Sequence, residues 1–151
     1  MDNISKPERN TQNRIIALFR DELRYTYLGD WEDRDGNSNI EDRLLTDYLT
    51  HQGYTPAQIS QALYKLHTAA DKTTRSLYDN NKEVYKFLRY GIQVKITASE
   101  NTETIQLINW KTPETNHFAI AEEVTIQGKK EKRPDIVLYQ RHCDRRHRTQ
   151  K

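Results

Sequence analysis

Apolar residues in the first 90 positions recur three or four residues apart, which is the period of a helix with one buried face. This pattern predicts four helices, over about 6–23, 40–52, 56–70 and 75–90. Ser5 with Glu8, and Thr55 with Gln58, have the spacing of capping boxes, and Asn39 is the expected cap of the second helix.

After Gly91 the hydrophobic period changes from 3.6 to two. Residues 92–96 and 104–109 alternate apolar and polar side chains, which predicts two antiparallel strands joined by a polar turn at 99–103. Residues 118–126 predict a third strand and 135–139 a fourth, while 25–31 is a short extended piece near the N-terminus. Helices followed by a mostly antiparallel sheet predict an α+β fold.

An acid-rich loop separates the first two predicted helices and superficially resembles a calcium-binding loop. Its candidate ligands are Asp33, Asp35, Asn37 and Glu41. Their spacing fits the calcium frame poorly and the flanking helices are wrong for an EF-hand, so a solvated loop is the better interpretation.

Composition narrows the class of protein. The chain has one domain's worth of residues, 151, but only 34% are hydrophobic and the mean hydropathy is −1.02. Such a low apolar content is typical of part of a domain, or of a domain that packs against others. The net charge is +2, of which residues 141–151, with five Lys or Arg and one Asp, contribute +4, so residues 1–140 carry −2. Basicity is therefore no evidence for nucleic-acid binding.

Compartment signals are few. The single cysteine, Cys143, rules out an internal disulfide and a thiolate zinc cluster. The N-terminus is polar, and no apolar run approaches the ~20 residues of a membrane span. We expect a cytoplasmic protein.

The stretch Lys132-Arg133-Pro134-Asp135 stands directly before the apolar residues of the last predicted strand. Pro134 has no amide hydrogen and suits the first position of a strand, which places Asp135 at the strand entrance. An aspartate there is ordinarily a turn former. The surrounding sequence favours a chemical role.

Four ordered blocks, from about residue 8 to residue 139, resemble the N-terminal region of the restriction subunit (HsdR) of type I restriction-modification enzymes. The blocks are 11–14 with 23–29, 38–41 with 53–54, 107–110 with 116–118, and 122–125 with 133–135. The resemblance implies a restriction-endonuclease-like, PD-(D/E)xK nuclease domain.

The resemblance also implies site residues. Asp135 matches the family's metal-binding and catalytic aspartate. Glu8 fits the acidic residue that the family carries on its first helix, with Glu41 as a second candidate, although Glu8 could equally serve only as a capping residue. Lys132 and Arg133 could bind the DNA backbone or form a solvated pair in a loop. Glu122 and Glu123 are expected to face solvent, with a helper-ligand role as the alternative.

The family's activity is Mg²⁺-dependent cleavage of double-stranded DNA, coupled to an ATP-driven motor and performed with modification and specificity subunits. The motor's phosphate-binding pattern, Gly-x4-Gly-Lys-Ser/Thr, is absent from this chain. We therefore expect no cleavage and no ATPase activity from the chain alone. The alternative function is a non-catalytic assembly module of the restriction complex.

The chain departs from the family pattern after Tyr139, where a hairpin and Glu-x-Lys are expected. Thr149 and Lys151 stand at the Glu-x-Lys spacing, and Thr cannot replace Glu as a ligand. Back-translation of residues 140–151 with one choice of codons, read one nucleotide later, gives Asn-Gly-Ile-Ala-Ile-Gly-Val-Ile-Glu-Leu-Lys. We hypothesise a frameshift near codon 140, which leaves 1–140 as a partial nuclease domain with an exposed, aggregation-prone strand edge, and 141–151 as a disordered basic tail.

Overall fold

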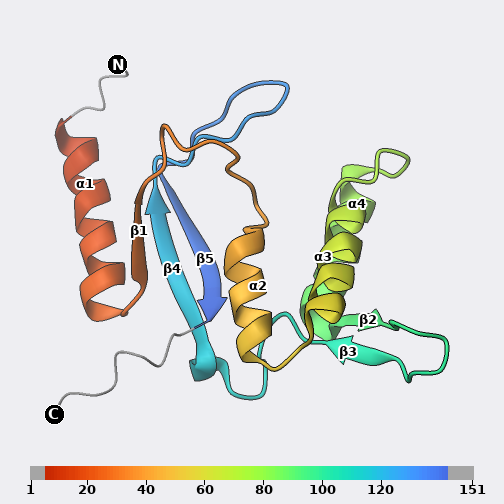
Figure 1. Ribbon diagram of the computed structural model, residues 1–151. Helices are drawn as coiled ribbons and strands as arrows, with labels where there is room; N and C mark the ends of the chain where they lie inside the picture. Colours follow the sequence, from red (N-terminus) through yellow and green to blue (C-terminus); the bar gives the residue numbers. More distant parts are fainter. Residues whose placement is uncertain (1–5, 143–151) are drawn as a thin grey trace, which may run out of the picture. The chain divides into compact units, whose positions relative to one another are not determined.

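The computed structural model describes residues 6–142, which form two compact units (Figure 1). The first unit holds residues 6–41 and 117–142, and the second holds residues 42–116. The described residues of the predicted 1–140 domain are divided between these two units. Every helix within residues 6–142 is too short or too polar to span a bilayer.

The first unit begins with α1 (Lys6–Ala17), which continues into a π-helical turn, Leu18–Glu22. Arg24 then adopts a left-handed backbone (φ 62°), and the chain reverses into β1 (Thr26–Asp30). The Tyr25 ring packs edge-on against Phe19 and stacks on Phe118. The predicted first helix and extended piece are both present, while the predicted cap Ser5 lies outside the described residues.

The sheet of the first unit has the strand order β1-β4-β5, where β4 is Asn116–Glu122 and β5 is Ile136–His142. β1 and β4 are parallel, with Thr26 opposite Ala119 and Asp30 opposite Glu122. β5 runs antiparallel to β4 and lies at the edge of the described sheet (Figure 1).

Within residues 6–142 the predicted α+β class, with four α-helices and mostly antiparallel strands, is confirmed. The predicted order of helices first and strands afterwards is wrong, because β1 precedes three of the four helices. Two parallel strands cannot be joined by a tight turn and need a long crossover connection. Residues 31–115 form that connection, so in the sequence nearly all of the second unit lies between two paired strands of the first.

Small and aromatic side chains share the core of the first unit. Ala119, Ala121 and Val124 are fully buried, and Tyr139 packs with them. Partly buried apolar residues cover this cluster: Leu28, Trp31, Ile126 and Val137. The Trp31 and Tyr139 rings lie 5.4 Å apart. The core therefore ties β5 to the loop that follows β1.

The second unit contains α2 (Asp42–His51), α3 (Pro56–Ala70) and α4 (Leu77–Tyr90). The capping box predicted at α3 is confirmed, because Thr55 Oγ1 accepts the Gln58 N–H and Gln58 Oε1 accepts the Thr55 N–H. The predicted cap of α2, Asn39, is wrong, since the helix begins only at Asp42. The Ile40 N–H instead bonds the Ser38 hydroxyl in a turn ahead of the helix.

The predicted antiparallel pair of the second unit is confirmed, but its strands are short: β2 is Ile92–Val94 and β3 is Glu103–Ile105. Just past the ends of β2 and β3, side chains instead of a partner strand form the hydrogen bonds to the backbone. Gln61 of α3 bonds both the N–H and the carbonyl of Lys95, and the Tyr54 hydroxyl accepts the Gln106 N–H. The strands therefore end where side chains of α3 and of the connection before it replace the backbone ladder.

The second unit has an apolar interior of its own between α2, α3 and the β2–β3 pair. Its buried members include the large aliphatic residues Leu49, Ile59, Leu66, Ile92, Val94 and Ile105. They are residues that the helical and alternating patterns predict to face inward.

Candidate functional site around Asp135

Asp135 lies immediately before β5 and is exposed to solvent. Its backbone carbonyl accepts the Glu123 N–H at 2.9 Å and Gln12 Nε2 at 3.4 Å, and the Pro134 carbonyl accepts the Val124 N–H at 3.1 Å. Among residues 6–142, no hydrogen bond or ion pair engages the Asp135 carboxylate. The main chain is held in place while the carboxylate stays open to a ligand.

Two consecutive glutamates, Glu122 and Glu123, lie beside this main chain and are only 4% and 3% exposed. We call them the carboxylate pair. Successive side chains of a regular strand point to opposite faces. Glu123 interrupts this alternation at the end of β4, because its backbone is left-handed (φ 52°). The expectation that these glutamates face solvent is wrong.

The carboxylate pair is neutralised by groups of α1 and of the segment before β5. Arg9 Nη2 lies 2.9 Å from Glu122 Oε1, and Arg9 Nη1 lies 3.8 Å from Glu123 Oε1. Glu123 also accepts Gln12 Nε2 at 3.0 Å and pairs with Arg133 Nε at 3.1 Å. Two guanidinium groups thus balance two buried carboxylates, as burial requires. The hydrogen bond to Glu122 raises the pKa of Arg9 further above its ordinary value.

Strand β1 completes the surroundings of Glu122. The Trp31 N–H donates to the Glu122 carbonyl at 2.9 Å, which extends the parallel register. Burial, followed by the negative charge of Glu122 and a hydrogen bond to it, raises the pKa of the Tyr27 hydroxyl. β1, β4 and α1 therefore all converge on this carboxylate.

The acidic candidates of the helical segments have different surroundings. Glu8 is exposed in the first turn of α1. Glu41 is bound in bidentate fashion by Arg34, at 3.0 and 2.9 Å. The α1 residue that reaches Asp135 is Gln12, one turn after Glu8. The sequence indicates that Gln12 faces inward, because it lies four residues before the apolar Ile16 and so shares a face of the helix with it; both are buried.

The two basic residues before Asp135 are placed differently. Lys132 is exposed, and its backbone forms both hydrogen bonds of a bridge to Ile126. Arg133 is only partly exposed and pairs with Glu123 and with Glu32. Arg133 therefore neutralises protein carboxylates, whereas Lys132 extends from the turn into solvent.

A family model described as the type I restriction enzyme R protein N terminus matches residues 5–142. This chain belongs to that family. The search of curated proteins and the search of solved structures each return no significant match. The resemblance drawn from the four sequence blocks is thereby confirmed at the level of the family.

The resemblance implies that this R protein N terminus binds Mg²⁺, and the side chains present show whether they can form such a site. Magnesium favours several oxygen ligands around one point. Within the described residues, no group of three or more His, Cys, Asp or Glu side chains is arranged to hold a metal ion. Arginines engage the carboxylate pair, so these two carboxylates are not open to a metal ion. The described residues do not complete a magnesium site by themselves.

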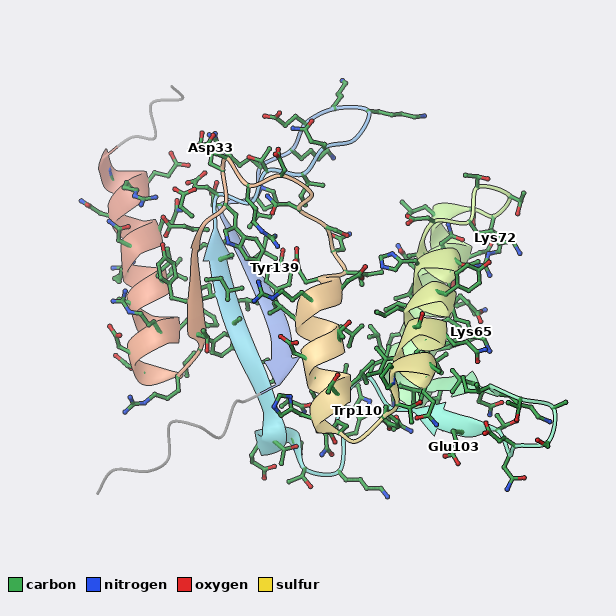
Figure 2. The ribbon with its side chains drawn as sticks, in the orientation of Figure 1. Asp33, Lys65, Lys72, Glu103, Trp110 and Tyr139 are labelled. Atoms are coloured by element: carbon green, nitrogen blue, oxygen red, sulfur yellow. The ribbon has the colours of Figure 1, made fainter. Side chains whose placement is uncertain are left out.

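The acid-rich loop of this R protein N terminus borders an open cavity of about 350 Å³, beside the turn that precedes β5. Asp33 on this loop lies beyond the end of β1 (Figure 2). Two basic residues, Arg34 and Arg133, also line the cavity. The Asn37 amide donates to the carbonyls of Trp31 and Thr125. These bonds hold the loop against the rest of the unit.

Proposed function

We propose that this chain is the nuclease segment of a type I restriction R subunit and that Asp135 is its catalytic, metal-binding carboxylate. One observation carries the proposal. Hydrogen bonds anchor the main chain of Asp135, while its carboxylate is exposed and no described side chain binds it. Membership of the R protein family supports it. A phosphodiester-cleaving site needs such a carboxylate to hold its divalent ion.

The chain supplies too little to cleave DNA by itself. The second carboxylate that Mg²⁺ requires is not available from Glu122 or Glu123, because Arg9 and Arg133 already pair with them. The Glu-x-Lys that the resemblance implies would follow Tyr139. We therefore propose that Asp135 is one ligand of a site completed by other residues, and that DNA translocation depends on a separate ATP-driven motor.

A nuclease assay on double-stranded DNA with Mg²⁺ tests this proposal. The chain as given is compared with a version whose residues after Tyr139 follow the shifted reading, joined to the motor and assembled with the modification and specificity subunits. Only the second should cleave, and Asp135→Ala should abolish its cleavage. Asp33→Ala, at a second exposed aspartate of the same unit, is the matched control and should cleave normally. Cleavage by the chain as given, or by the assembled Asp135→Ala variant, would overturn the proposal.

A non-catalytic assembly module is the second candidate function. The observation that favours it is the neutralised carboxylate pair, whose charges stabilise the fold rather than remaining open for a metal. In this case the chain as given should co-purify with the modification or specificity subunit, and Asp135→Ala should not weaken that association. Failure to bind either subunit would exclude this candidate.

A further inference from the structure

Helix α4 buries one face and exposes the other. Its inward side includes the buried Asn80 and the partly buried Val84, Phe87 and Leu88. The centre of the opposite side, by the 3.6-residue period, holds Tyr78, Lys82, Tyr85 and Arg89, at positions i, i+4, i+7 and i+11. We call these four residues the α4 face. Rings and cations alternate along it.

The rings of the α4 face are unusually open to solvent, since Tyr78 is 72% and Tyr85 is 63% exposed. Exposed rings that gather on one helix face, rather than standing singly, are typical of surfaces that bind a partner. The acidic residues of the helix lie to one side, where Glu83 pairs with Lys86 at 3.5 Å. The centre of the face is therefore aromatic and cationic without an acidic group.

A tryptophan extends the α4 face at its C-terminal end. Trp110, on the segment after β3, is 48% exposed and donates from Nε1 to the Leu88 carbonyl at 2.9 Å (Figure 2). The Arg89 guanidinium carbon lies 5.3 Å from the centre of its ring. The hydrogen bond fixes the indole beside the cation, so a third aromatic ring lies next to the α4 face.

We propose that the α4 face, together with Trp110, binds single-stranded DNA. Cations that neutralise phosphates between rings that stack on bases are the combination that binds unpaired strands. Tyr78 and Tyr85 are separated along the helix axis by ~10 Å, the rise of seven residues, so the two rings can each stack on a different base of one strand. This inference concerns the second unit and is independent of the role proposed for Asp135.

Two other classes of partner fit the α4 face less well. A duplex hides the faces of its bases, so exposed tyrosine rings would have nothing to stack on. Protein interfaces share the enrichment in Tyr, Trp and Arg, but Lys is depleted in them. The α4 face has no aliphatic residue and places Lys82 between its two tyrosines.

Fluorescence anisotropy with a labelled 12-nucleotide oligothymidylate tests the proposal on the full chain. The oligonucleotide should bind more tightly than a duplex of equal length. Tyr78→Ala and Tyr85→Ala should each weaken binding at least about fivefold, whereas the Phe variants should retain it because the ring remains. Tyr64→Ala is the matched control, since Tyr64 lies on α3 and is 73% exposed, and it should bind like the parent chain.

The cations have a separate signature. Lys82→Gln or Arg89→Gln should reduce the slope of log affinity against log salt by about 0.7, the contribution of one phosphate contact on a single strand. Lys129→Gln, at an exposed lysine of the first unit, should leave the slope unchanged. Asp135→Ala should bind like the parent, which separates this inference from the nuclease proposal. Equal affinity for the duplex, unchanged affinity of both Tyr→Ala variants, or no binding at all would overturn it.

Discussion

Removing the guanidinium of Arg9 should destabilise the first unit, because it leaves the buried Glu122 carboxylate without its counter-charge. In Arg9→Met the Glu122 carboxylate stays buried and loses its hydrogen bond at 2.9 Å. Breaking one side of a buried ion pair costs about 3–5 kcal/mol. The Arg9 side chain is 39% exposed, so water already screens part of the interaction, and we expect a smaller loss of about 2–3 kcal/mol.

A double-mutant cycle measures the coupling free energy between Arg9 and Glu122. Glu122→Gln removes the charge and keeps the shape, and it leaves Arg9 able to reach water, so it should cost about 1 kcal/mol. The double variant Arg9→Met with Glu122→Gln contains no unpaired buried charge at this position. It should also lose only about 1 kcal/mol, which corresponds to a coupling of about 2–3 kcal/mol.

Urea unfolding is the assay. The chain has two tryptophans, so a Trp110→Phe background leaves Trp31, whose N–H bonds the Glu122 carbonyl, to report on the first unit. Combining Arg9→Met with Thr55→Ala in the second unit is the additive control. If the Arg9 and Glu122 losses add within about 0.5 kcal/mol, the reasoning about the carboxylate pair is refuted.

Three further predictions concern other parts of the fold. Burial raises the pKa of the Tyr139 hydroxyl, so the protonated hydroxyl contributes stability that is complete below the ordinary tyrosine pKa of 10.0 and is lost as pH rises through the higher folded pKa. In urea titrations at alkaline pH, Tyr139→Phe should lose less stability per pH unit than the parent chain. The same loss per pH unit in both proteins would contradict this prediction. Gly91→Ala should lower the free energy of unfolding by at least about 1 kcal/mol more than Gly53→Ala, as measured by thermal unfolding. Both glycines have positive φ, but only at Gly91 would a Cβ lie 2.7 Å from the Thr104 side chain. Equal losses in the two variants would refute the clash. Thr55→Ala should cost about 1 kcal/mol through the lost capping box, and Thr55→Ser should restore it.

Helices were predictable because their signals are local. The box of Thr55 and Gln58 and the proline at the first helical position involve neighbours within one turn, and the structure contains them as expected. The start of α2 was missed because it depends on distant groups. Arg34 holds Glu41 in the loop, and Asn37 bonds the Thr125 carbonyl, so the helix begins after these anchors.

Strand lengths were less predictable than strand existence. The alternating pattern located β2 and β3, but Gln61 and Tyr54 decided where their pairing stops, and neither residue is near those strands in sequence. The parallel register of β1 and β4 was also inaccessible, because it joins residues about 90 positions apart. Pairing at such a separation leaves no periodic signal in either strand.

The sequence alone determined the family, the α+β class and the position of Asp135 at a strand entrance, since each depends on residue types in short, ordered blocks. Only the tertiary structure decided what surrounds that aspartate. Glu123 is buried and Gln12 reaches the Asp135 main chain because α1 packs on strands more than 100 residues later. Two adjacent glutamates suggest an exposed position until the arginines that neutralise them are brought alongside by folding.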